Sequence, residues 1–317
     1  MNKKRLMFMG TPDFALPCLD MLNHREDTEI VSVVTQPDRQ SGRGYKVSFP
    51  PVKQYALDNN LECVQPSTVK DDEFRKYLME KNPDIIIVIA YGRILPEFVL
   101  DYPKYGCINV HASLLPKYRG AAPIQWSVIN GEKKTGVTTM YMDKGLDTGD
   151  KILTTEVELD EFETTGTLFD KLAEISVKTL SDTVDLLYSN SALRVPQDHA
   201  EMTYAPMISK EMSYIDFSKN AEEISCLIRG LNPSPGAKIK INGKILKIYM
   251  AKPSAEVTEK LPGTVVECSE RVVVACGNKT TLEIMELQPE GKKIMKTNEF
   301  LRGNSLLKKD DILGGIL

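Results

Sequence analysis

The chain has 317 residues and a net charge of −4 at pH 7, a length that is generous for one domain and comfortable for two. Apolar residues make up 42% and charged residues 26% of the chain, which is typical of a globular protein. The longest apolar run extends only from Ile85 to Ala90, which excludes a membrane-spanning protein. The basic N-terminus lacks the apolar segment of an export signal, and the six cysteines form no CxxC pair. These features predict free thiols in the cytoplasm, and neither a zinc site nor a redox dithiol.

The first half of the chain alternates strand and helix patterns. Short strands are expected at residues 6–9, 30–35, 62–64, 84–90 and 107–110, and helices at 14–23, 51–59 and 71–80. The run at 84–90 is almost continuously apolar and β-branched, as in a central parallel strand buried on both faces. This order predicts a doubly wound, mostly parallel α/β sheet. No Gly-x-Gly-x-x-Gly follows the first strand, and Pro12 removes a backbone donor there, so a nicotinamide cofactor is not expected.

The second half of the chain changes character after a long helix. Strands are expected at 135–142 and 151–159, and the helix at 165–188. A further helix at 221–231 precedes short strands at 237–241, 245–251, 263–268, 272–275 and 281–288, the first two joined by the hairpin turn Asn242-Gly243. Such a series favours a small closed barrel, of which the OB type binds oligonucleotides. The predicted division is a domain at 1–189, an aperiodic linker at 190–207 and a C-terminal domain at 208–317.

Charge differs between the two predicted domains. Residues 208–317 carry 17 basic against 14 acidic side chains, a net +3, so that the remaining residues carry −7. The basic excess is a weak indication of a polyanionic partner for the C-terminal domain, and a solvated surface is the simpler explanation.

The most informative motif is Asn109-Val110-His111, which ends the strand at 107–110. Ligands of an open α/β sheet bind at the carboxyl ends of its strands, and residues two apart in a strand point to the same side. Asn109 and His111 therefore project together as an amide donor and a group that titrates near neutrality, a pair suited to chemistry at a carbonyl. The alternative is a structural histidine whose hydrogen bonds serve stability alone.

Asp147 is the candidate partner of His111. If the strand beginning at Thr135 pairs beside the strand that ends at His111, the loop at 143–150 returns to the same edge of the sheet, and a carboxylate there would orient the imidazole or relay its proton. Two alternatives stay open: Asp143, Asp147 and Asp150 bind a divalent cation, although their spacing does not fit an EF-hand, or the loop is a solvated turn.

Two further loops lie at the same predicted edge of the sheet. The glycine-rich loop at 36–46 carries the cations Arg39, Arg43 and Lys46, which suit phosphate contacts to a nucleic acid or simply face solvent. The bend at 89–96 holds Gly92 and Pro96, which would leave backbone groups free for a flat heteroaromatic ring, unless the bend is only the exit of a buried strand.

Taken together, these residues resemble the 10-formyltetrahydrofolate-dependent formyltransferase family, and in particular its members that act on methionyl-tRNA. The resemblance extends in order over nearly the whole chain. The segments that carry it are Gly10 to Ala15, the loop at 36–44, Ala90-Tyr91-Gly92, Asn109 to Pro116, Arg119 to Pro123, and Gly145 to Gly149.

The resemblance implies a Rossmann-like catalytic domain in which Asn109, His111 and Asp147 carry catalysis. It implies a folate site that comprises Tyr91, Gly92, Arg93, Ile94, Leu95, Ser113, Leu114, Leu115 and Pro116. It further implies that Arg39, Arg43 and Lys46 contact the tRNA and that Phe14 lines a methionyl pocket. In one respect the chain departs from the family: Ser234 stands where Trp is frequent in the Asn-Pro-Trp-Pro segment, so an aromatic contact in the barrel is absent.

The expected activity is therefore transfer of a formyl group from 10-formyltetrahydrofolate to the α-amino group of methionyl-initiator-tRNA, by a monomer that needs no metal and no membrane. Two alternatives remain: a formyltransferase that acts on an amino-sugar nucleotide, and a non-catalytic tRNA-binding protein.

Overall fold

A computed structural model describes residues 3–41, 46–303 and 306–314 of the chain. The chain divides into two compact units. The first comprises Met1–Pro123, Lys134–Val157 and Phe169–Ala205, and the second comprises Ile124–Lys133, Glu158–Leu168 and Pro206–Leu317. In the described part of the chain, no helix is long and apolar enough to cross a membrane.

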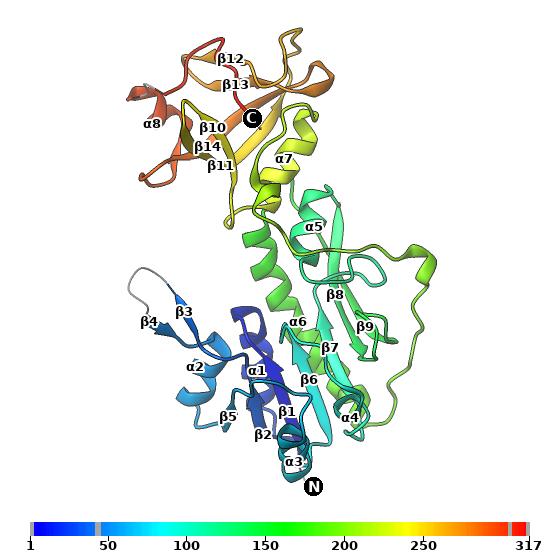
Figure 1. Ribbon diagram of the computed structural model, residues 1–317. Helices are drawn as coiled ribbons and strands as arrows, with labels where there is room; N and C mark the ends of the chain where they lie inside the picture. Colours follow the sequence, from blue (N-terminus) through cyan, green and yellow to red (C-terminus); the bar gives the residue numbers. More distant parts are fainter. Residues whose placement is uncertain (1–2, 42–45, 304–305, 315–317) are drawn as a thin grey trace. The chain divides into compact units, whose positions relative to one another are not determined.

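The first unit contains a twisted sheet with the strand order β5-β2-β1-β6-β7-β8-β9 (Figure 1). Its strands are β1 (Lys4–Gly10), β2 (Thr28–Val34), β5 (Cys63–Val64), β6 (Ile85–Ile89), β7 (Cys107–His111), β8 (Lys134–Tyr141) and β9 (Lys151–Glu158). Neighbouring strands from β5 to β7 are parallel, and β8 is antiparallel to β7. The expected doubly wound, mostly parallel sheet is confirmed.

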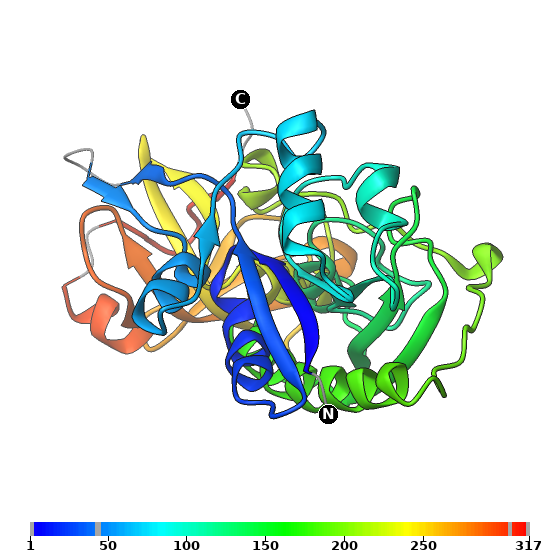
Figure 2. The same cartoon turned by 90° about the horizontal axis from the view of Figure 1, so that it is seen from below.

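Helices lie on both faces of this sheet (Figure 2). They are α1 (Leu16–Asn23), α2 (Pro51–Asp58), α3 (Asp72–Lys81), α4 (Glu97–Leu100) and α6 (Thr165–Tyr188). On one face, Met7, Ile86 and Cys107 pack with Phe74 of α3 and Val99 of α4. Alternate strand residues turn to the other face, where α1 and α6 meet. There the Cys18 thiol lies 3.1 Å from the Ser176 hydroxyl.

Local sequence explains where these elements begin and end. Every residue of β6 is buried, as expected for a central strand covered on both faces. The Asp71 carboxylate accepts a hydrogen bond from the Phe74 N–H and caps the first turn of α3. Asn82 ends that helix in the left-handed conformation, at φ 41°.

The second unit is a curled antiparallel sheet with the order β10-β11-β14-β13-β12, and β15 pairs with β14. Its strands are β10 (Ala237–Ile241), β11 (Lys244–Ser254), β12 (Val265–Cys268), β13 (Val272–Ala275), β14 (Thr281–Pro289) and β15 (Met295–Lys296). Three helices assigned mainly or wholly to this unit are α5 (Pro123–Ile129), α7 (Ala221–Gly230) and α8 (Thr297–Arg302). Ile224 and Ile228 of α7 pack into the core of this sheet.

Some elements differ from the sequence prediction. The short helices α4 and α8 were not expected, because four to six residues give too little periodicity to separate a helix from a turn. The basic loop, expected to be irregular, instead begins and ends in a two-stranded antiparallel ribbon of β3 (Arg39–Ser41) and β4 (Lys46–Ser48).

Candidate active site

The centre of the site is His111, the last residue of β7. Its side chain is 7% exposed, and Nε2 lies 2.9 Å from the main-chain oxygen of Tyr118. A carbonyl only accepts hydrogen bonds, so Nε2 must carry a proton and donate it. In the neutral imidazole, the other ring nitrogen, Nδ1, is consequently a hydrogen-bond acceptor.

The ionisable group beside Nδ1 is Asp147. β8 pairs antiparallel with β7, with His111 opposite Thr138 and Ile108 opposite Tyr141, so β8 ends beside the start of β7. The loop that follows folds back and brings Asp147 to His111, the contact that the sequence predicted. Asp147 Oδ2 lies 3.8 Å from His111 Nδ1 and accepts a hydrogen bond of 2.8 Å from the Gly120 N–H. The carboxyl side chain is 15% exposed. The contact to Nδ1 is longer than a hydrogen bond, which is common for catalytic pairs without substrate.

The backbone of this loop is tightly constrained. Asp147 itself has a positive φ of 51°, which an aspartate adopts more readily than most residues. At Gly149, an added Cβ would lie 1.8 Å from the main-chain oxygen of Tyr141. At Gly120, φ is 119° and a Cβ would lie 2.8 Å from the Ala205 oxygen. Close backbone contacts therefore require glycine at both position 120 and position 149.

The three acids of the loop have different partners. Asp143 Oδ1 accepts hydrogen bonds from the Gly145 N–H and the Thr148 hydroxyl, and thus closes a turn. Asp150 Oδ2 lies 3.5 Å from Arg194 Nη1, and Asp147 alone of the three faces His111. Within residues 3–41, 46–303 and 306–314, no group of three or more His, Cys, Asp or Glu side chains is arranged to hold a metal ion.

Asn109 lies two residues before His111 on the same strand, and its side chain is half-buried. In the register, Asn109 and His111 lie opposite Met140 and Thr138 of β8, which places both on one face. Among the described residues, none forms a hydrogen bond with the Asn109 amide. The amide therefore remains available to a substrate oxygen.

The residues predicted to hold folate form two turns. In the first, Gly92 has φ 79° and Ile94 is 72% exposed, whereas Leu95 is buried. The Tyr91 ring is buried in the core, while its main-chain oxygen accepts a hydrogen bond from Gln36 Nε2. Arg93 donates to the main-chain oxygens of residues 66 and 67. The exposed groups of this turn are thus its backbone at Gly92 and the Ile94 side chain.

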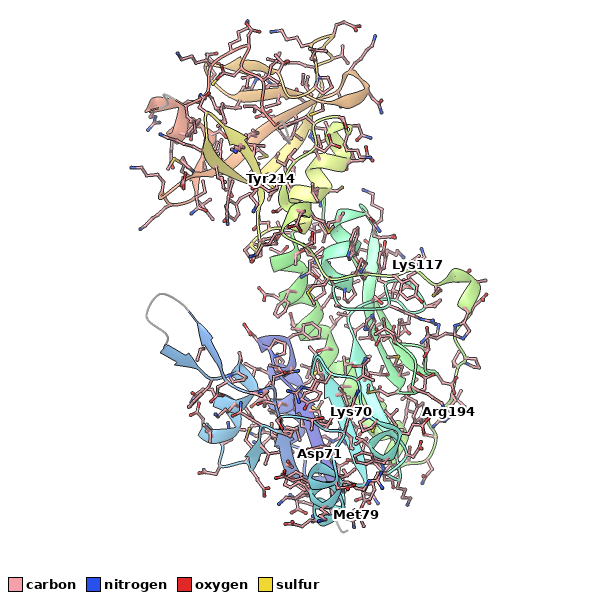
Figure 3. All side chains as sticks on the ribbon, viewed as in Figure 1. Lys70, Asp71, Met79, Lys117, Arg194 and Tyr214 are labelled. Carbon is pink, nitrogen blue, oxygen red and sulfur yellow. The ribbon has the colours of Figure 1, made fainter. Side chains whose placement is uncertain are left out.

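The second turn, residues 113–116, directly follows β7. The Ser113 hydroxyl donates to the Lys117 oxygen, and the Leu115 N–H donates to the Thr138 hydroxyl. Leu115 and Pro116 are buried and Leu114 is half-buried, so the side chains of this turn pack into the protein rather than face solvent. Figure 3 labels Lys117, which lies exposed at the end of this turn.

The remaining predicted residues are placed less completely. Phe14 is 5% exposed and packs edge-on against Phe169, with ring centroids 5.3 Å apart. The backbones of Arg39 and Lys46 lie in β3 and β4. Arg43 lies outside the described residues.

The sequence reasoning missed three groups that shape the site: the Tyr118 carbonyl, the Gly120 N–H and the side chain of Gln197. The first two are main-chain atoms, which a residue pattern does not reveal. Gln197 lies in the stretch 190–207 that was expected to be a linker. In the structure this stretch is bound to the first unit, through bridges between Lys151 and Val195 and between Arg119 and Tyr204.

Chemically, the arrangement offers an amide donor and an imidazole on one face, with a carboxylate beside the imidazole. This combination suits addition to a carbonyl and departure of a leaving group, since it can stabilise an oxyanion and move a proton.

Comparison with known proteins identifies the family. Residues 3–184 match the model of the formyl transferase family, and residues 207–305 match the model of the formyl transferase C-terminal domain. The chain is 49% identical over 302 residues to a methionyl-tRNA formyltransferase of Clostridioides difficile (strain 630), covering 95% of this chain and 97% of that protein. The chain belongs to the methionyl-tRNA formyltransferase family.

Other members of the family give the same result. A methionyl-tRNA formyltransferase of Bacillus subtilis (strain 168) is 47% identical over 311 residues, 98% of each chain. Among solved structures, the chain is similar to an N-formyltransferase of Helicobacter canadensis in complex with folinic acid and dTDP-3-aminofucose, with a TM-score of 0.67, 20% identity, and coverage of 91% of this chain and 100% of that one. At that identity, the likeness describes the fold alone.

Proposed function

We propose that this chain transfers the formyl group of 10-formyltetrahydrofolate to the α-amino group of methionyl-initiator-tRNA. The observation that carries the proposal is the juxtaposition of His111 Nδ1 with Asp147 Oδ2, 3.8 Å apart; His111 lies on the strand that presents Asn109, and Asp147 lies in the loop after β8. It is supported by relatives of that name that are 45–49% identical and match both units of the chain.

In the proposed reaction the neutral amine adds to the formyl carbon, so that a new carbon–nitrogen bond forms and an oxyanion develops. α-Amino groups titrate at about pH 8, so a useful fraction is neutral at physiological pH. The bond between the formyl carbon and the folate nitrogen then breaks, and the proton lost by the amine ends on that nitrogen.

Three side chains serve these steps. The Asn109 amide, which has no partner among the described residues, donates to the oxyanion. Because His111 Nε2 is committed to Tyr118, the proton that stabilises the oxyanion and later moves is carried by Nδ1. Asp147, held by Gly120, keeps the imidazole oriented, stabilises its charged form and helps to accept the amine proton.

We assign the folate to the two turns at 91–95 and 113–116. The Tyr91, Arg93 and Ser113 side chains are buried or engaged with main-chain groups, so recognition by these turns rests on backbone atoms and on apolar contact with Ile94. Exposed backbone beside an apolar side chain suits a flat heteroaromatic ring.

We assign the tRNA to the ribbon that carries Arg39, Arg43 and Lys46, together with residues 208–317 as an OB-type domain, and the methionyl side chain to the neighbourhood of Phe14. The net +3 charge of residues 208–317 and the five-strand order of their sheet support this assignment. Residues 1–189 would then form the catalytic domain.

The test is transfer of a labelled formyl group from 10-formyltetrahydrofolate, with charged initiator tRNA, uncharged tRNA, free methionine and an amino-sugar nucleotide as acceptors. Label on the charged initiator tRNA alone supports the proposal. Label on the amino sugar alone would instead favour that class of formyltransferase. Binding of tRNA without transfer of label would indicate a non-catalytic protein.

Variants separate catalysis from tRNA binding. Asn109→Ala should abolish most turnover while folding is unchanged. Arg39→Gln with Arg43→Gln should weaken tRNA binding and reduce the slope of log affinity against log salt concentration by about 2, because each phosphate contact contributes nearly one unit. An unchanged slope would contradict the assignment of the ribbon to tRNA.

A further inference from the structure

Gln197 is a buried side chain whose amide nitrogen bonds to the loop at 143–150 and lies 3.9 Å from the Met140 sulfur. It is 6% exposed, in a stretch where most residues face solvent. Its Nε2 donates to the main-chain oxygens of Asp147, at 2.9 Å, and Gly149, at 2.8 Å. The two carbonyls belong to the part of the loop that follows the left-handed backbone of Asp147, whose φ is 51°.

The other end of the amide is held by Arg119. Its guanidinium donates to Gln197 Oε1 from Nε, at 3.1 Å, and from Nη2, at 2.6 Å. Every hydrogen-bonding position of the amide is therefore filled: two protons on nitrogen meet two carbonyls, and two lone pairs on oxygen meet two N–H groups. The cation also fixes the direction of the amide, because a flipped amide would turn its NH2 toward Arg119.

Arg119 has an unusual environment. It is 2% exposed, and no ion pair to a carboxylate is found for it in the described residues. Its remaining side-chain contacts are to His199 Nδ1 and the Met202 sulfur. A buried guanidinium without an anion is costly, and an apolar side chain of similar volume would serve packing alone at least as well.

Main-chain hydrogen bonds also hold the stretch that carries Gln197 next to the site. Arg119 N–H donates to the Thr203 oxygen, and Ala205 N–H donates to the Arg119 oxygen, so the stretch that carries Gln197 is anchored beside Gly120. Gly120 in turn donates to Asp147 Oδ2. Asp147 is thus held through its carboxylate by Gly120 and through its backbone by Gln197.

On the basis of the proposed function, we infer that Gln197 is a positioning residue for Asp147 and that Arg119 acts through Gln197 by orienting its amide. Gln197 touches neither His111 nor a substrate. Its effect is to keep the Asp147 carboxylate facing His111 Nδ1, so its loss should affect the chemical step more than substrate binding.

The decisive variant is Gln197→Glu. It keeps the shape of the side chain and the acceptor toward Arg119, with which it gains a charge pair, but it turns an oxygen toward two carbonyls. We expect the protein to remain folded, the single-turnover rate to fall about 10- to 100-fold, and KM for both substrates to stay within about twofold. Gln197→Met lacks both the amide oxygen that accepts from Arg119 and the amide nitrogen that donates to the loop, and it should lose activity to a similar or greater extent.

A double-mutant cycle tests the role of Arg119. If Arg119 acts through Gln197, Arg119→Met lowers the rate in the wild-type background but changes the rate of Gln197→Met by less than about twofold. The matched control is Thr183→Val, which removes buried hydrogen bonds to Thr139 and to the Thr179 oxygen within the same unit but away from the loop. It should lower the melting temperature and leave the rate unchanged.

An activity-independent measurement separates this inference from the proposed function. Hydrogen exchange at the Gly120 amide, which is bonded to Asp147 Oδ2, should accelerate in Gln197→Glu and Arg119→Met but not in Thr183→Val. Accelerated exchange in a protein that formylates nothing would support the positioning role and refute the proposed function. Unchanged exchange, a rate loss matched by Thr183→Val, or a rise in KM at constant turnover would overturn the positioning role.

Discussion

Replacing Asp147 with Asn tests whether the carboxylate charge, rather than the shape of the loop, serves catalysis. Asparagine retains an oxygen that can accept from the Gly120 N–H, so the loop should persist, but the negative charge 3.8 Å from His111 Nδ1 is lost. At that distance, attraction between a carboxylate and an imidazolium is worth about 1 kcal/mol in water and about 4 kcal/mol at an effective permittivity of about 20. Both side chains are largely buried, which favours the upper part of this range.

This interaction is gained only while the imidazole is charged, so its loss should lower the rate of the chemical step by about 10- to 1000-fold, with about tenfold for each 1.4 kcal/mol. The assay is single-turnover transfer of labelled formyl to methionyl-tRNA at saturating folate, with the melting temperature measured in parallel. The matched control is Asp143→Asn in the same loop, where the side chain only closes a turn. A folded Asp147→Asn variant that retains a rate within about threefold of wild type would refute the reasoning.

Four further predictions concern stability, reactivity and folate binding. Gly149→Ala should lower the free energy of unfolding by more than about 3 kcal/mol and the melting temperature by about 6 °C or more, because its Cβ would meet the Tyr141 oxygen at 1.8 Å; an unchanged thermal melt would contradict this. Burial raises the pKa of Cys18 from 9.0 to about 12, so at pH 8 iodoacetamide should label half-buried Cys63 before Cys18 in the folded protein. Because the pKa of Cys18 is higher in the folded than in the unfolded protein, its contribution to the free energy of unfolding is fully present below pH 9 and should decline as the pH rises toward 12. Urea titrations at several pH values would detect this decline. Tyr91→Phe should raise the melting temperature slightly and leave KM for folate unchanged, since the Tyr91 hydroxyl is buried with no hydrogen-bond partner among the described residues and its desolvation is uncompensated; an increase in KM would show that the hydroxyl contacts folate.

The sequence was sufficient for most of the fold because long, regular patterns determine it. The β-branched run of β6 and the 24-residue apolar periodicity of α6 are local properties that survive in any tertiary context. The same holds for the alternation of short strands and helices that predicts a doubly wound sheet. Short elements such as α4 and β15 carry too few residues for a pattern and depend on their neighbours.

The candidate site was predictable in part, for a related reason. Asn109 and His111 are two apart on one strand, so their common direction follows from the pleat alone. Asp147 was expected beside His111 from strand pairing, but the contact depends on how the loop after β8 folds, because that strand ends beside Ile108. The tautomer of His111 did not follow, because it is determined by a main-chain oxygen, that of Tyr118.

The sequence by itself thus determined the class of sheet and the direction that Asn109 and His111 share on one strand. Only the tertiary structure decided what holds Asp147 beside His111. Gln197 stands 50 residues after Asp147, in a stretch without periodicity, and its role depends on hydrogen bonds to two carbonyls and one buried guanidinium. Periodicity reports how a residue is oriented within its own element, whereas a long-range hydrogen bond depends on where the folded chain returns, and no local pattern encodes that return.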